Sequence, residues 1–198
     1  MKSISLSKLV AVSLGALIVM LAVVFTLRAQ TPSLNLKGGS KLVYTMQTTN
    51  ASEDAQVILN TLTPTLSFKW KTPENQFGKV VMSTEEFASG RKLSSKLMED
   101  LTNSYGFFWM SKGMYSELAQ GKTQYFLNGS DKMSAVTRAG VEDMQVKVNG
   151  TMKTLQVLHA KSIIAGGDEF FVLNDATNPL IIKMTTVQGS FTLKEITE

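Results

Sequence analysis

Few residues of the types that carry catalysis occur in this chain, and they are scattered. His159 is the only histidine and there is no cysteine, so the chain offers neither a histidine-rich nor a thiolate metal site. Alternation along its expected strand places His159 on an apolar face, which favours a structural role. Asp168, Glu169 and Asp175 lie near expected strand ends, but no second carboxylate cluster completes an acid/base pair. We interpret these three as solvated loop residues.

Two short patterns resemble motifs of penicillin-recognising enzymes. Ser89 and Lys92 match the Ser-x-x-Lys pattern, and the run from Ser130 to Lys132 faintly resembles the second motif. The third motif is missing, the chain is much shorter than such enzymes, and so short a pattern arises easily by chance. We interpret both matches as coincidental. The sequence therefore predicts a protein that is not an enzyme and that uses no cofactor or metal.

The first 30 residues contain an unbroken apolar segment, from Leu9 to Leu27, behind Lys2 and Lys8. At a rise of ~1.5 Å per residue this segment makes a helix of roughly 28 Å, close to the ~30 Å hydrocarbon core of a bilayer. Its length favours an uncleaved membrane anchor. A cleavable secretory signal is the alternative, although the apolar centre of such signals usually has only about 7 to 15 residues.

Charge and cysteine content point to the cell envelope and away from nucleic acid. Removing Lys2, Lys8 and Arg28, which flank the apolar segment, from 20 basic residues leaves 17 against 16 acidic ones. A nucleic-acid surface needs a clustered basic excess, and Arg91 with Lys92 is interpreted as an exposed helix face. Absence of cysteine suits an exported domain. We expect a periplasmic domain tethered to the inner membrane, or secreted to the periplasm if the segment is cleaved.

Residues 31–40, with Pro32 and a glycine pair, suit a linker, and residues 41–198 suit a single domain. The clearest alternation places Leu66, Phe68 and Trp70 on one face and lysines on the other, as in an antiparallel sheet with one wet side. Period-two patterns and turn residues predict strands at 41–47, 56–62, 66–71, 79–82, 123–127, 144–148, 152–158, 170–173, 180–184 and 190–196.

Two helices interrupt these strands. Ser83 and Glu86 have the spacing of a capping box, and leucines recur every four residues from Leu93 to Leu101, which predicts a helix after Ser83. A second helix is predicted over residues 111–120, with Ser111 as N-cap. The aromatic run at 107–109 leads into it and favours core packing over a ligand site. Asn-Gly pairs at 128–129 and 149–150 predict turns, the second of type I′.

The motifs of the last third resemble a known family. The segments 146–150, 169–175, 178–184 and 189–193, together with 109–112, are similar in order to an uncharacterised family of bacterial envelope proteins with a LolA-like half-barrel. This resemblance covers about residues 40 to 197. It implies a mainly β (α+β) fold, in which a strongly curved antiparallel sheet has one or two helices packed on its concave side. It also implies an exported domain with an apolar concavity, and it carries over no catalytic residue.

Two functions follow from this reading. In the first, the domain is a carrier or sensor that binds a lipid or lipoprotein acyl chain on an apolar face. In the second, it is a structural or protein–protein interaction module of the cell envelope without a ligand, because helix and sheet close on each other into a dry core. In both functions the protein contacts the membrane through its N-terminal helix if that helix is retained. The residues predicted to line the apolar face are Tyr44, Met46, Leu66, Phe68, Trp70, Leu93 and Leu97.

Overall fold

The structure is a computed structural model that describes residues 34–48, 50–96, 100–102 and 106–198. The predicted anchor or signal segment, residues 1–30, lies outside this part of the chain, as does Leu97. Within the described ranges, no helix is long and apolar enough to cross a membrane.

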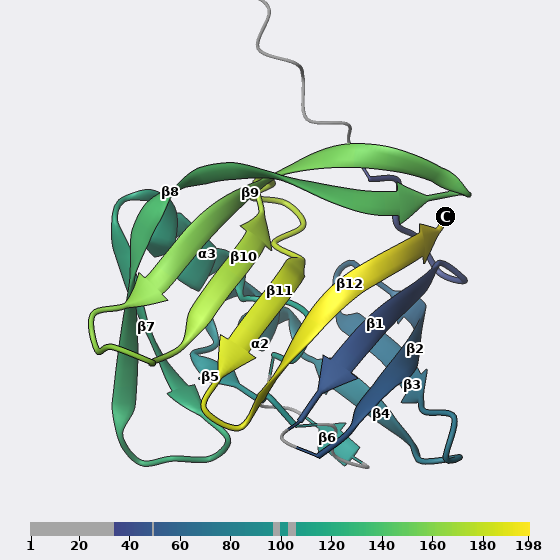
Figure 1. The fold of residues 1–198 in the computed structure, drawn as a ribbon, viewed down its shortest axis with the longest axis horizontal. Coiled ribbons are helices and arrows are strands. Elements are labelled where there is room, and N and C mark those ends of the chain that lie inside the picture. Colours follow the sequence, from purple (N-terminus) through teal and green to yellow (C-terminus); the bar gives the residue numbers. More distant parts are fainter. Residues whose placement is uncertain (1–33, 49, 97–99, 103–105) are drawn as a thin grey trace, which may run out of the picture. The chain divides into compact units, whose positions relative to one another are not determined.

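The described domain is mainly β, with a large, strongly curved sheet and two helices on its inner side, as predicted (Figure 1). Along the sheet the strand order is β5-β7-β8-β9-β10-β11-β12-β1-β2-β3-β4-β6, with an additional pairing between β8 and β12. Adjacent strands are antiparallel except for β4 with β6 and β5 with β7, and β8 also meets β12 in parallel. The elements are β1 Lys41–Gln47, β2 Ser52–Thr61, β3 Leu66–Lys71, β4 Phe77–Met82, α2 Thr84–Ser89, β5 Lys92–Leu93, β6 Asp100–Thr102, α3 Lys112–Ala119, β7 Lys122–Leu127, β8 Met133–Val148, β9 Thr151–Ser162, β10 Glu169–Leu173, β11 Ile181–Thr186 and β12 Gly189–Thr197.

Strand β3 has the two-faced pattern that its sequence predicts. Leu66, Phe68 and Trp70 are buried, whereas Lys69 and Lys71 are exposed. Its neighbours keep the same phase, since Phe68 pairs with Leu59 on β2 and with Val80 on β4, both of which are buried. Opposed apolar side chains on one face hold neighbouring strands together. This face lines the inner side of the sheet, and we call it the inner face of β1–β4.

The first predicted helix is much shorter than expected. Ser83 is its N-cap and accepts a hydrogen bond from the Glu86 amide at 3.1 Å, as predicted, but the helix ends at Ser89. Gly90 follows as its C-cap and donates to the Glu86 carbonyl at 2.8 Å. The leucine spacing beyond it was misread as helical.

In that stretch the described residues 92–93 and 100–102 form short strands instead. Lys92 and Leu93 belong to β5, which pairs with β7. The Phe126 amide donates to the Arg91 carbonyl at 2.8 Å, and the Asn128 amide donates to the Leu93 carbonyl at 2.9 Å. Residues 100–102 form β6, which pairs with β4. Long-range pairing thus overrides a local helical period.

The second helix and both Asn-Gly turns are confirmed. Helix α3 begins after Ser111, whose hydroxyl accepts from the Met114 amide at 3.2 Å, and Gly121 follows it with a φ of 136°. Asn149 and Gly150 have φ values of 49° and 82°, the positive pair that a type I′ turn needs. The hairpin around this turn is longer than predicted, because β8 begins at Met133 and β9 ends at Ser162.

Candidate functional site

The predicted apolar face is buried. Tyr44, Leu66 and Phe68 have no exposed surface, and only 3% of Trp70 is exposed. Met46 is partly buried and packs against the same core. Leu93 is also buried, but it comes from β5 and not from a helix facing the sheet.

An aromatic segment, residues 107–109, packs directly onto this face. The rings of Phe108 and Tyr44 stack with their centroids 4.0 Å apart and their planes at 17°. Phe68 contacts both Phe108, at 5.8 Å, and Trp109, at 5.3 Å between centroids. Offset and tilted ring pairs at such distances are favourable beyond the area they bury. The segment therefore covers the inner face at Tyr44 and Phe68.

Hydrogen bonds to the β10–β11 region hold the aromatic segment in place. Trp109 Nε1 donates to Asn178 Oδ1 at 2.8 Å, and the Met110 amide donates to the Pro179 carbonyl at 3.0 Å. The Ile181 amide donates to the Phe108 carbonyl at 2.7 Å. These bonds pair polar groups that would otherwise be buried without partners.

Tyr44 joins the inner face to the same region. Its hydroxyl donates to the Ile181 carbonyl at 2.9 Å, and complete burial raises the pKa of the Tyr44 phenol well above its usual value of 10.0. A buried phenolate would lose its hydration without gaining a cation. Tyr44 is therefore a neutral donor within the core.

Two cavities lined by described residues lie elsewhere. One of about 350 Å³ is lined by Val43, Asp54, Gln56, Lys71 and Thr72, with Pro73 and Asn75 of the β3–β4 turn. Another of about 320 Å³ lies beside the β7–β8 turn and includes Lys92 and Phe126. Of the seven predicted ligand-binding residues, the six that the structure describes line neither cavity.

At one end of the inner face, three polar side chains each have one buried atom that forms no hydrogen bond with any described residue. These atoms are Trp70 Nε1, Thr72 Oγ1 and Glu53 Oε2, all of them buried. Glu53 lies opposite Met46 on β1, and Thr72 continues the inward alternation of β3. A buried donor or acceptor without a partner costs roughly 1 to 3 kcal/mol. We call this group the polar corner.

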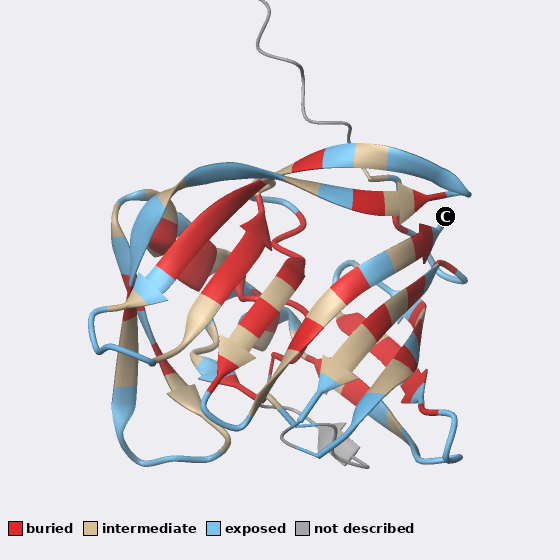
Figure 2. Cartoon of the chain, viewed as in Figure 1, coloured by how far each residue is buried: buried red, intermediate tan, exposed pale blue. Residues whose placement is uncertain are grey.

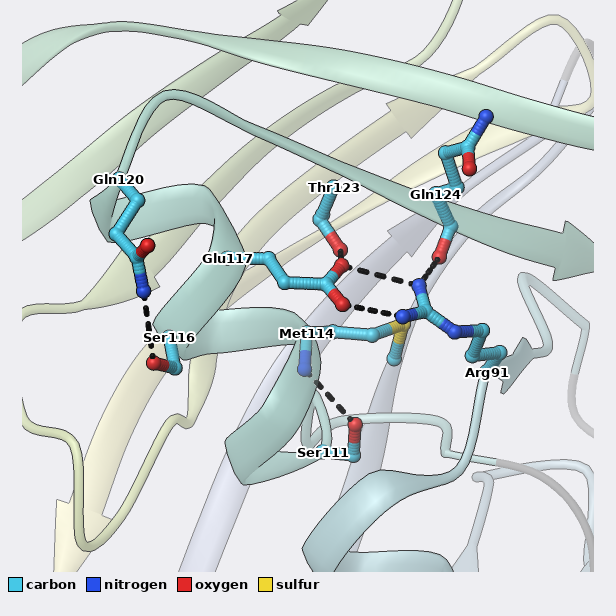
Figure 3. A network of polar contacts seen from close by, with 8 residues as sticks. All are labelled: Arg91, Ser111, Met114, Ser116, Glu117, Gln120, Thr123 and Gln124. Atoms are coloured by element: carbon cyan, nitrogen blue, oxygen red, sulfur yellow. Dashed lines mark hydrogen bonds and ion pairs between the residues drawn. The ribbon is translucent and has the colours of Figure 1, made fainter.

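A second polar network fastens α3 to the sheet (Figure 3). Arg91 forms a two-pronged ion pair with Glu117, and its Nη1 also donates to the Gln124 carbonyl at 3.0 Å. Thr123 Oγ1 donates to Glu117 at 2.9 Å. The hydrogen bonds from Arg91 are the main reason that the pKa of the Glu117 carboxyl is lowered. Arg91 thus connects α3 to β7 and does not lie on a solvated helix face.

His159 lies in a third polar group, where β8, β9 and β10 run side by side. Its Nδ1 contacts the Glu142 carboxylate, its Nε2 lies 2.7 Å from Glu169 Oε1, and its ring stacks on Phe171 at 4.2 Å. Both ring nitrogens therefore face a carboxylate oxygen. Lys161 Nζ lies 3.4 Å from the same Glu169 oxygen.

This arrangement corrects the interpretation of Glu169 as a loop residue, since it begins β10. Burial raises the pKa of the Glu169 carboxyl, but hydrogen bonds from His159 and Lys161 outweigh that effect, and the pKa lies below its usual 4.5. Asp168 also has a partner, because it accepts a hydrogen bond from the Tyr125 hydroxyl. Within the described ranges, no group of three or more histidine and acidic residues is arranged to hold a metal ion.

Sequence reasoning found the inner face but missed the polar corner. Trp70 was identified as an apolar side chain, whereas Glu53 and Thr72 were not identified at all. The alternation of Leu66, Phe68 and Trp70, continued by two residues, predicts that Thr72 also faces inward. No comparable signal marks Glu53, because β2 begins four residues before the strand that its sequence predicts.

Comparison with known proteins gives little further guidance. No family model matches the sequence, and no curated protein matches it. The fold is similar to a chain in a solved structure described as the complex of Pseudomonas aeruginosa MucA/MucB, with 10% sequence identity and a TM-score of 0.39. The match covers 79% of this chain and 50% of that one, so this chain accounts for half of its length. We draw no functional conclusion from so distant a likeness.

Proposed function

We propose that this is a non-enzymatic cell-envelope protein whose curved domain acts as a structural or protein–protein interaction module. The N-terminal apolar segment supports the envelope location, whether it stays as an anchor or is cleaved. The observation that carries the proposal is the stacking of Phe108 on Tyr44 at 4.0 Å. Because the chain's own aromatic segment packs on the inner face, that face stabilises the fold and is not a binding site for an acyl chain.

Native mass spectrometry of the full-length protein, extracted from its own membrane in a mild detergent, tests this proposal. We expect the mass of the polypeptide alone after the detergent is removed in the gas phase. A bound lipid at one copy per chain, kept through a detergent exchange, would overturn the proposal.

A second candidate function is the binding of an apolar ligand with a polar head. The polar corner supports it, because Trp70 N–H, the Thr72 hydroxyl and the Glu53 carboxylate could donate to and accept from such a head. An apolar pocket with a few convergent polar groups is the usual form of a small-molecule site. In this function the aromatic segment would have to shift to admit the ligand.

The variant Trp70→Phe separates the two functions, because it keeps an aromatic ring and removes the N–H. If no ligand accepts that N–H, the variant loses no hydrogen bond, and its free energy of unfolding in urea falls by about 1 to 2 kcal/mol because of the smaller buried ring alone. If a ligand does accept it, the wild type purifies with a ligand that the variant fails to retain. Phe77→Leu is the matched control, since Phe77 is 75% exposed.

A further inference from the structure

Among the residues that the structure describes, one stretch of β8 has a strand partner on one side only. Residues 133–137 pair with β7, and residues 147 and 148 pair with β12. Between them, β9 is the neighbouring strand of β8, and no strand of the described chain pairs with the other side. We call residues 139–145 the open edge.

The pairing with β7 stops at a defined point. The register of β8 against β9 shifts between Arg138 and Gly140, so one extra residue bends the strand there. The Arg138 amide makes the last contact on that side, donating to the Gly121 carbonyl at 2.7 Å. Beyond this bulge the strand runs away from β7.

The open edge is exposed to solvent, and its pairing with β9 keeps it extended. Val141 is 48% exposed, Glu142 and Asp143 are exposed, and Figure 2 shows exposed residues along this part of the hairpin. Its other side is fully paired, from Gly140 with His159 to Gln145 with Thr154. Two side chains also reach across to β9, since Glu142 contacts His159 and Gln145 Nε2 donates to Thr154 Oγ1 at 2.7 Å.

Such an edge is a template for another strand. Seven residues at ~3.4 Å each span about 24 Å, and alternate residues point their N–H and C=O groups outward. Proteins usually keep exposed edges short, as this one does at the two ends of its sheet, where β5 has two residues and β6 has three. The open edge is longer than either, so its two carboxylates and the bulge before it, and not shortness, restrict which strands can pair with it.

Charge decides which kind of strand fits. The open edge carries Glu142 and Asp143 and no basic residue, while the neighbouring Arg138 guanidinium donates to the Ala119 carbonyl at 2.7 Å and Lys147 pairs with Glu195 at 3.3 Å. A second copy of this chain, paired antiparallel about these residues, would place carboxylates opposite each other, which is destabilising. A segment with basic residues would instead be attracted.

We propose that the open edge binds an extended, basic segment of a partner protein by adding it as a strand to β8. This inference rests on the proposed function, since it names the surface through which the module acts. Backbone hydrogen bonds supply affinity in this mode, and the side chains that alternate along the strand supply specificity.

A labelled peptide of seven alternating lysine and valine residues with blocked ends tests the proposal, by fluorescence anisotropy with the full-length protein in neutral detergent micelles. Two further peptides carry N-methyl groups on the odd-numbered or the even-numbered backbone nitrogens. An added strand uses only one of these sets, so we expect one methylated peptide to bind at least about tenfold more weakly and the other to bind within about twofold. Equal affinity of all three, or no saturable binding up to about 1 mM, would overturn the proposal.

Two substitutions test whether the peptide binds at the open edge. Asp143→Asn should weaken binding of the unmethylated peptide several-fold, whereas Asp131→Asn, the same change in the exposed β7–β8 turn, should not. Amide hydrogen exchange should show new protection within residues 139–145. Protection elsewhere, or equal loss in both variants, would contradict the assignment. Failure here would leave the native mass result intact, whereas a bound lipid would remove the proposed function and leave the peptide result to stand alone.

Discussion

The inner face of β1–β4 and the open edge of β8 belong to one sheet but are completed in different ways. The inner face is covered by the chain itself, since Tyr44, Phe68 and Phe108 are fully buried against one another. The open edge is covered by nothing that the structure describes, and its residues are mostly exposed. The difference indicates that the concave side of this sheet stabilises the fold, whereas its rim is where the proposed partner strand would bind.

Phe108→Ala should have the largest effect. Phe108 is fully buried and contacts Tyr44, Phe68, Phe107 and Phe191, so its truncation leaves a cavity in the middle of the core. We expect a loss of about 3 to 5 kcal/mol in the free energy of unfolding, measured by urea denaturation. The control is Phe77→Ala, which should change it by less than about 0.5 kcal/mol. A small effect of Phe108→Ala would show that the aromatic segment does not pack as described.

A pair of glycine substitutions compares the turn of the β8–β9 hairpin with the open edge. Gly150 has a φ of 82° at the hairpin turn, so Gly150→Ala should cost about 1 to 2 kcal/mol through backbone strain. A Cβ at either Gly150 or Gly140 would meet no atom within 4 Å, but Gly140, in the open edge, is not among the positive-φ glycines. Gly140→Ala should therefore be neutral or slightly stabilising. Equal losses in urea denaturation would contradict the assigned turn.

The His159 group predicts an acid-dependent loss of stability. The pKa of Glu169 is lower in the folded protein than its usual 4.5, so its contribution is complete above that value and is lost as the pH falls through the folded pKa. We expect the urea midpoint of the wild type to fall more steeply between about pH 5 and about pH 3 than that of Glu169→Gln. Parallel pH profiles would show that His159 and Lys161 do not stabilise this carboxylate.

Arg91→Lys should have the smallest effect. The side chains of Arg91 and Glu117 are 38% and 40% exposed, and water screens such pairs. Lysine keeps the charge but cannot make the two-pronged contact, so we expect a loss of about 0.5 kcal/mol in the free energy of unfolding. A loss as large as that of Phe108→Ala would show that the network is part of the core.

Local signals predicted much of this fold. Alternation located β1, β3 and most other strands, the Asn-Gly pairs located two turns, and Ser111 located the start of α3. The helix predicted through Leu93 was wrong because long-range pairing with β7 and β4 holds that segment extended. The first half of β8 was missed because its side chains are mostly exposed and leave no apolar alternation to read.

The candidate site was harder to predict than the fold. The inner face follows from alternation, since Leu66, Phe68 and Trp70 differ clearly from the lysines between them. The segment that packs on this face does not follow from alternation, because nothing in the sequence around residues 107–109 specifies that those rings stack on Tyr44 and Phe68. The partners of His159 come from β8 and β10 and meet it only in the folded sheet.

Residue-resolved amide hydrogen exchange of the full-length protein, read by NMR, tests the central comparison most directly. The Met110 and Ile181 amides hydrogen-bond across the aromatic segment, so they should exchange only on the timescale of global unfolding. Along the open edge, alternate amides between residues 139 and 145 should exchange orders of magnitude faster, because no described strand pairs with them. If Met110 and Ile181 exchanged as fast as those edge amides, the aromatic segment would open readily, and the inner face would be an accessible site instead of a closed core.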